Sequence, residues 1–205
     1  MNRFSLLLFF LFTTVFFQQP LLAQSDDGDK PSVEHNFRPG ISFNYSPHSF
    51  KGWGTVQNSK MVFVNGQLWH TSVKPNNVSL RIGSELIFTH WVQYPENGID
   101  GPRDQRVGFG LVPFHFVVPF SNHPITPFVS ASFGLIFFND RLPAIDGASL
   151  NYKLSSGLGV EIDVGTDHKV QLGYRLQHIS NGNSTVENPG IDSHVFFANF
   201  IFAKW

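Results

Sequence analysis

His178 and Ser180 lie two residues apart in a stretch whose alternation is typical of a β-strand. Polar residues or glycine separate the apolar members of that alternation, which are Val170, Leu172, Tyr174 and Leu176. His178 and Ser180 continue the apolar register, so a potential base and a potential nucleophile project toward whatever that face contacts. If the face contacts lipid, the sequence predicts a lipid substrate.

A serine hydroxyl attacks esters when a base removes its proton, and a carboxylate improves that base by fixing its tautomer. Asp192 opens the next apolar segment, so a hairpin that pairs it with His178 would complete a set of Ser180, His178 and Asp192. The catalytic interpretation depends on this pairing register. A bare His-x-Ser pair in a strand is more often an ordinary polar pair at the rim of a sheet or barrel.

Composition excludes several other classes of chemistry. The formal net charge is -1 and no cluster of Lys or Arg is present, so nucleic acid is not an expected partner. The chain has no cysteine, which excludes disulfides and thiolate chemistry. Its 9 histidines are scattered without the spacing of a metal motif, so we expect neither a metal nor another cofactor.

The N-terminal residues predict export. Arg3 precedes a charge-free run from Phe4 to Phe17, and Leu21-Leu22-Ala23 then ends in a small residue. Residues 1–23 therefore read as a signal peptide, with an N-terminal membrane anchor as the alternative. Residues 24–40 are polar and contain Pro and Gly, which predicts a loosely packed periplasmic lead-in. We assign residues 41–205 to the folded domain.

That domain is predicted to be an all-β, eight-stranded antiparallel transmembrane β-barrel with a packed polar interior. Eight alternating segments are expected at about 41–50, 61–74, 78–93, 106–120, 125–140, 149–165, 168–181 and 193–205. Most exceed the roughly 9 to 11 residues that a membrane-crossing strand needs, whereas strands of a soluble sandwich usually have about 5 or 6. A barrel of this size has room only for side chains, so a pore is not expected.

Connector length indicates the orientation of the barrel. Tight connectors near residues 75–77, 121–124 and 165–167 alternate with longer ones at 51–60, 94–105, 141–148 and 182–192. Outer-membrane barrels have short periplasmic turns and longer extracellular loops. Ser180 and Asp192 are therefore expected at the outer-leaflet rim of a Gram-negative outer membrane.

The sequence His178-Ile179-Ser180-Asn181, followed by Asn188-Pro189-Gly190-Ile191-Asp192, resembles the signature of the lipid A 3-O-deacylase (PagL) family of outer-membrane barrels. The resemblance implies a membrane serine esterase that removes the acyl chain ester-linked at the 3-position of lipid A. It implies that Ser180 is the nucleophile, His178 the general base and Asp192 the orienting acid.

The chain departs from the family at the acid, where the best-known form has Glu and this sequence has the shorter Asp192. Glu187 and His194 are lower-ranked substitutes for that role. Candidate donors to the oxyanion are Asn181, the backbone N–H of Gly182, and Asn188, which matches the family's Asn-x-Gly element.

Two competing functions stay open at this point. A non-catalytic barrel could act as an adhesin or as a structural or binding protein through its longer loops. Another lipid-active barrel, a phospholipase or an acyltransferase, would share the site but differ in the bond it cleaves or in the acceptor. The expected partners are lipopolysaccharide as substrate and the outer-membrane lipids, and homo-oligomerisation is left open.

Overall fold

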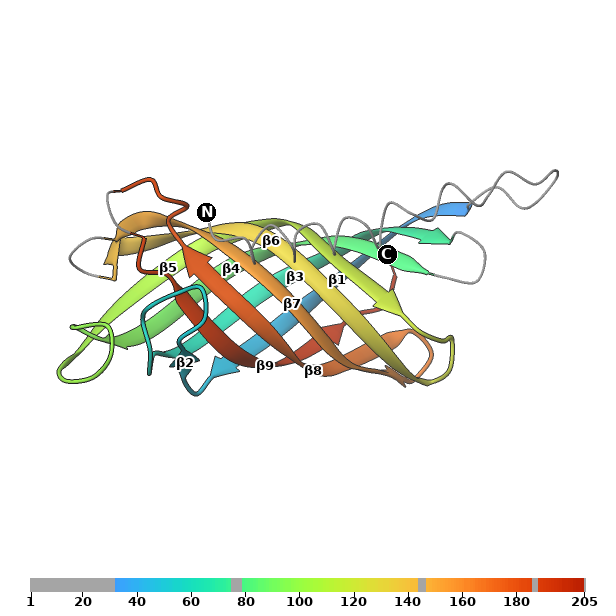
Figure 1. Cartoon of the computed structure of the whole chain (residues 1–205). Coiled ribbons are helices and arrows are strands. Elements are labelled where there is room, and N and C mark those ends of the chain that lie inside the picture. The colour runs from blue at the N-terminus through green and yellow to red at the C-terminus, as the bar shows by residue number, and fades with distance from the viewer. Residues whose placement is uncertain (1–31, 75–78, 144–146, 186–187, 205) are drawn as a thin grey trace, which may run out of the picture. The chain divides into compact units, whose positions relative to one another are not determined.

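The chain forms one closed antiparallel sheet in the computed structural model, which describes residues 32–74, 79–143, 147–185 and 188–204. The strands are β1 (Ser32–Ser46), β2 (Ser49–Phe50), β3 (Lys60–Lys74), β4 (Leu80–Pro95), β5 (Arg103–Pro119), β6 (Ile125–Leu142), β7 (Ala148–Val164), β8 (His168–Ser180) and β9 (Ile191–Ile201). Neighbours from β3 to β9 pair in chain order, and β1 pairs with both β3 and β9, which closes the barrel (Figure 1). Eight long strands confirm the predicted antiparallel barrel.

The start of the barrel differs from the prediction. β1 begins at Ser32 rather than near residue 41, because residues expected in the lead-in pair with β3 from the Ser32–Lys74 pair onward. Most of these first residues are exposed. They are polar because they contact solvent, although they belong to a strand. The proposed signal peptide at 1–23 and the lead-in up to residue 31 lie outside the described residues.

The segment expected as one strand at 41–50 is divided. β1 ends at Ser46, and after Pro47 and His48 the chain returns to the sheet as the two-residue β2. β1 pairs with the later part of β9, whereas β2 pairs with its start, where Phe50 lies opposite Asp192. The segment that follows β2 is therefore carried to the start of β9.

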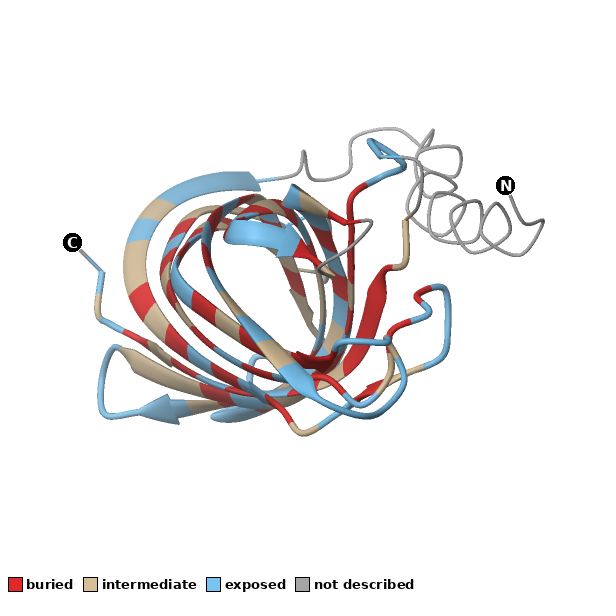
Figure 2. Ribbon diagram, turned by 90° about the vertical axis from the view of Figure 1, so that its left-hand side faces the viewer, coloured by how far each residue is buried: buried red, intermediate tan, exposed pale blue. Residues whose placement is uncertain are grey.

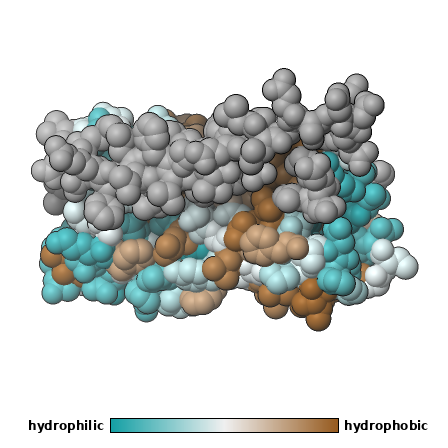
Figure 3. Space-filling model, turned by 45° about the vertical axis from the view of Figure 1, so that its right-hand side comes forward, coloured by the Kyte–Doolittle hydropathy of each residue, from teal (hydrophilic) through white to brown (hydrophobic). Residues whose placement is uncertain are grey.

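Burial alternates along the long strands, as Figure 2 shows by the banding of red and pale blue on the ribbons. The outer wall carries exposed large hydrophobic side chains on every long strand, including Phe43, Leu68, Phe88, Phe109, Phe133, Leu158, Leu172 and Phe196. Hydrophobic side chains also lie on the face seen in Figure 3. An apolar outer wall on a closed sheet is the arrangement that lipid requires. No helix in the described part of the chain is long and apolar enough to cross a bilayer.

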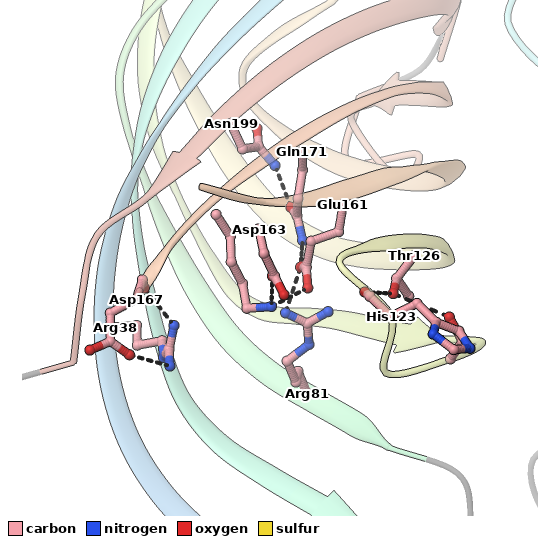
Figure 4. A network of polar contacts seen from close by, with 11 residues as sticks. Arg38, Arg81, His123, Thr126, Glu161, Asp163, Asp167, Gln171 and Asn199 are labelled. Carbon is pink, nitrogen blue, oxygen red and sulfur yellow. Dashed lines mark hydrogen bonds and ion pairs between the residues drawn. The ribbon is translucent and has the colours of Figure 1, made fainter. Parts of the chain in front are cut away.

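The interior is polar in the middle and at the end where β7 joins β8. Figure 4 shows the network at that end, in which Glu161 accepts hydrogen bonds from Arg81 at 2.6 Å, Lys169 at 2.9 Å and Gln171 at 2.8 Å. Deeper inside, Glu85 bonds to His115 at 2.8 Å. Charges of both signs pair here because a narrow interior cannot hydrate them singly.

The other end of the interior also contains buried polar side chains, such as His90 and Asn151, which agrees with the predicted packed polar interior, but a hydrophobic cluster lies among them. The members of this cluster are Val56, Met61, Phe63, Ile87, Val92, Tyr94, Val112, Ile136, Phe138, Leu142, Ile179, Ile191 and Val195. The cluster lies where β8 ends and β9 begins. The end of β8 and the start of β9 therefore pack against this cluster on their inner side.

Candidate active site on the outer wall

His178 and Ser180 occupy the last outward positions of β8, as the alternation predicts. The intervening Ile179 belongs to the interior cluster, which fixes the two polar side chains on the opposite face. Ser180 is only 9% exposed, although it points away from the barrel interior. Its surroundings are a sheltered site on the outer wall rather than an open lipid-facing surface.

The pairing register places Asp192 directly opposite His178. His178 Nδ1 lies 2.6 Å from Asp192 Oδ1. A carboxylate only accepts hydrogen bonds, so Nδ1 is the donor and, in the neutral ring, Nε2 is left with a lone pair. The hairpin thus leaves Nε2 as the acceptor nitrogen of the neutral His178 ring, and the assumed register is confirmed.

Ser180 and His178 share one strand face, about 7 Å apart between Cα atoms by strand geometry. Among the described contacts, none is a hydrogen bond between Ser180 Oγ and the His178 ring. In unliganded active sites such bonds are often long and shorten only when substrate binds. The structure therefore assembles the base and its carboxylate and holds the serine beside them.

The segment 51–56 after β2 supplies further groups at the site. The backbone N–H of Gly54 donates to Asp192 Oδ2 at 2.6 Å. Trp53 places the edge of its ring against His178, with 5.6 Å between centroids and an interplanar angle of 79°, and is 52% exposed. The sequence analysis selected neither Trp53 nor Gly54, because no local pattern reports a contact between residues this far apart.

The turn after Ser180 is held by its own asparagines. The Asn181 backbone N–H donates to Asn188 Oδ1 at 3.0 Å, and the Asn181 side chain bonds to Thr185 Oγ1 at 2.6 Å and to the Asn183 N–H at 2.9 Å. These contacts direct the Asn181 side chain into the turn. Asn188 accepts this bond through Oδ1, so its Nδ2 is the side-chain atom that can donate a hydrogen bond.

Two glycines of this turn have backbone conformations that other residues rarely adopt. Gly182 has φ +64°, and a Cβ there would lie 2.7 Å from the Tyr152 ring. Gly190 has φ +53°, and a Cβ there would lie 3.2 Å from His178 Cε1. Tyr152, which pairs with Ser180 across β7 and β8, is a further wall of the site that sequence reasoning did not select.

His194 lies away from the catalytic pair. Its Nδ1 is 2.5 Å from the Tyr174 hydroxyl, and its ring stacks on Phe50 with centroids 4.4 Å apart. His178 Nδ1 has Asp192, and not His194, as its partner. Glu187, the other substitute considered, lies outside the described residues. Among the residues that the structure describes, no group of three or more His, Cys, Asp or Glu side chains could hold a metal ion.

Comparison with known proteins identifies a family and several barrels of similar fold. The family model of the lipid A 3-O-deacylases (PagL) matches residues 58–200. The crystal structure of the outer membrane enzyme PagL is similar at 18% identity and a TM-score of 0.58, covering 78% of this chain and 97% of that chain. Neisserial surface protein A (NspA) is similar at 13% identity and a TM-score of 0.45, covering 86% and 100%. No curated protein matches the chain.

The closed sheet with its apolar outer wall defines an outer-membrane β-barrel that carries a serine, a histidine and an aspartate on its outer face. The family match extends from the approach to β3 to the last residues of β9 and so includes these residues. The chain belongs to the lipid A 3-O-deacylase (PagL) family. It is an ester hydrolase of that family, with lipid A as its substrate, and the resemblance seen in the sequence is confirmed.

Proposed function

We propose that Ser180, His178 and Asp192 carry out the hydrolysis of the acyl ester at the 3-position of lipid A. The observation that supports this best is the 2.6 Å contact between His178 Nδ1 and Asp192 Oδ1, on the face that also presents Ser180. A base oriented by a carboxylate beside a serine is the arrangement that activates a hydroxyl toward esters.

In the first step, His178 Nε2 takes the proton of Ser180 while Oγ attacks the ester carbonyl carbon. The tetrahedral intermediate collapses when the protonated ring gives that proton to the 3-oxygen of the sugar, and an acyl-serine is left. In the second step, His178 removes a proton from water, and the resulting attack on the acyl-serine releases the fatty acid and restores Ser180. Asp192 holds the ring and offsets its positive charge in both steps.

The negative charge on the intermediate needs hydrogen-bond donors, each worth about 3 kcal/mol in such sites. We assign this role to Asn188 Nδ2 and to the backbone N–H of Gly182. The bond from Asn181 N–H to Asn188 Oδ1 orients the Asn188 amide. Asn181 has a supporting role in this assignment, because its side chain bonds within the turn.

We place the site at the extracellular rim, against the outer leaflet. Three of the four connectors at the end of the barrel that carries Ser180 are long, namely 51–59, 96–102 and 181–190, whereas the fourth, 143–147, is no longer than 75–79 and 120–124 at the other end, where 165–167 is shorter still. This is the asymmetry of outer-membrane barrels. At the rim the acyl chains of lipid A can lie along the apolar wall while water reaches the acyl-serine. The steps use only side chains and water, so we propose no cofactor.

The experiment that tests the proposal is mass spectrometry of lipid A from a Gram-negative host that produces this protein, beside the same host with Ser180→Ala. Loss of one hydroxyacyl chain with the unaltered protein alone is the expected result. Unchanged lipid A in both hosts, with the barrel folded in the outer membrane, would instead favour a binding or structural function. Release of a chain from a phospholipid would favour a different lipid substrate.

A further inference from the structure

Residues 51–56 contact the side of Asp192 that faces away from His178. The two carboxylate oxygens have separate partners: Oδ1 bonds to His178 Nδ1, and Oδ2 accepts the Gly54 N–H at 2.6 Å. Asp192 is nearly buried between these two donors. Its orientation is therefore set from both sides.

Backbone hydrogen bonds hold residues 51–56 in this place. Thr55 donates to the Pro189 carbonyl twice, from N–H at 2.5 Å and from Oγ1 at 2.8 Å. Val56 N–H donates to the Gly190 carbonyl at 3.2 Å, and Val56 forms an isolated parallel bridge with Ile191. The side chain of Val56 belongs to the interior cluster. The segment is thus fixed to the start of β9 and to the barrel interior at the same time.

The approach is so close that two positions of the segment have no room for a side chain. A Cβ on Gly52 would lie 2.6 Å from Asp192 Oδ2, and a Cβ on Gly54 would lie 2.5 Å from the Gly190 carbonyl carbon. Neither glycine has a positive φ. Glycine is required at these two positions because a side chain would have no room against β9, and not because of the backbone conformation.

We propose that residues 51–56 are a positioning element of the active site, in which the Gly54 amide holds Asp192 so that its other oxygen stays on His178. The inference rests on the catalytic roles proposed above. An aspartate that lacks this bond can rotate about its side-chain torsions, and each rotation away from Nδ1 frees the imidazole. A charge-assisted bond from a fixed backbone N–H removes that freedom.

The same geometry limits the length of the acid. Gly52 and Gly54 leave no space beyond Asp192 Oδ2 for another methylene. Glutamate at position 192 would have to displace the segment or withdraw its carboxylate from Gly54. We therefore expect Asp192→Glu to lower kcat in this chain.

The test is a double-mutant cycle between Gly52→Ala and Asp192→Ala, with kcat and KM measured by mass spectrometry on purified lipid A in detergent micelles. The methyl group of Gly52→Ala displaces the carboxylate, so kcat should fall about 10²-fold, the effect of misplacing a catalytic group by about 1 Å, while KM stays unchanged. In the Asp192→Ala background the methyl group meets no carboxylate. There Gly52→Ala should cause no further fall.

The matched control is Gly101→Ala in the loop 96–102 at the same end of the barrel. Gly101 has φ +86°, and no atom lies within 3.7 Å of a Cβ placed there, so the substitution strains a loop without reaching Asp192. Its kcat should equal that of the unaltered protein. All variants are first checked for a folded barrel by their mobility on gels without heating.

Three outcomes would overturn the inference: an equal proportional loss from Gly52→Ala in both backgrounds, an equal loss from Gly101→Ala, or a rise in kcat with Asp192→Glu. Failure of the catalytic assignment looks different. In that case Asp192→Ala or Ser180→Ala alone would retain full activity, whatever Gly52→Ala does.

Discussion

At the scale of single residues, the hydrogen bond between His178 and Asp192 decides which ring nitrogen is the base in the proposed mechanism. Asp192→Asn keeps the size of the side chain but offers an amide, which can hold the ring in the wrong tautomer. We expect kcat to fall by about 10³- to 10⁴-fold with the barrel folded, because members of such a set act as a unit. The measurement is the rate of acyl release from lipid A. Full activity would remove Asp192 from the set.

His194 also points outward from β9, but we expect its replacement, unlike that of Asp192, to change the rate of acyl release only slightly. It bonds to Tyr174 and stacks on Phe50, and it does not contact His178 or Ser180 in the described structure. His194→Phe keeps a ring that can stack on Phe50, so the rate of acyl release should change by less than about 3-fold, as the loss of one remote hydrogen bond allows. A loss as large as that of Asp192→Asn would show that His194 acts in the site.

At the scale of elements, the turn between β8 and β9 brings His178 and Asp192 together, and Gly190 lies in this turn close to the His178 ring. Gly190→Ala introduces backbone strain of about 1 kcal/mol and a methyl group against His178 Cε1 and Gly54 Cα. We expect the rate of acyl release to fall strongly. The measurement is the rate of acyl release by variants that have first been shown to be folded.

Gly165→Ala is the control for strain alone. Gly165 lies in the turn between β7 and β8 with φ +66°, and a Cβ there has no atom within 4 Å. Both variants should lose similar stability in urea unfolding, but only Gly190→Ala should lose activity. Equal loss of activity in the two variants would mean that the rate follows overall stability rather than the geometry of the site.

At the scale of the whole molecule, the two ends of the interior serve different purposes. The apolar cluster supports the strand ends that carry the site, while Glu161 joins Arg81, Lys169 and Gln171 at the far end. Glu161→Ala should lower the free energy of unfolding by about 3 kcal/mol, because it leaves cations in a narrow interior without their main acceptor. The rate of acyl release of the folded protein should not change.

Urea unfolding in lipid vesicles measures that loss. Glu34→Gln is its control, because Glu34 pairs with Lys74 on an exposed part of β1 and such pairs add little to stability. Its unfolding midpoint should match that of the unaltered protein. If Glu161→Ala unfolds at the same urea concentration as Glu34→Gln, the interior network does not stabilise the barrel.

The sequence by itself determined the strands from β3 to β9 and the side of the wall on which His178 and Ser180 lie. Both follow from a period of two, which is a local property: once Ile179 is buried inside, its neighbours must face outward. The register that pairs Asp192 with His178 was an assumption at the level of the sequence, and the structure supplies it. The start of β1 was not predictable, because exposed polar residues carry no alternation.

Only the tertiary structure decided what surrounds the catalytic pair. The Gly54 N–H reaches Asp192 across 138 positions of the chain, and Trp53 reaches His178 in the same way. The alternative role of His194 was settled by Tyr174 and Phe50, which lie on two other strands. These contacts arise when closure of the barrel brings β2 to β9, and no pattern within one strand records them. Local periodicity therefore specified the faces, whereas the pairing of distant strands specified the neighbours that position Asp192.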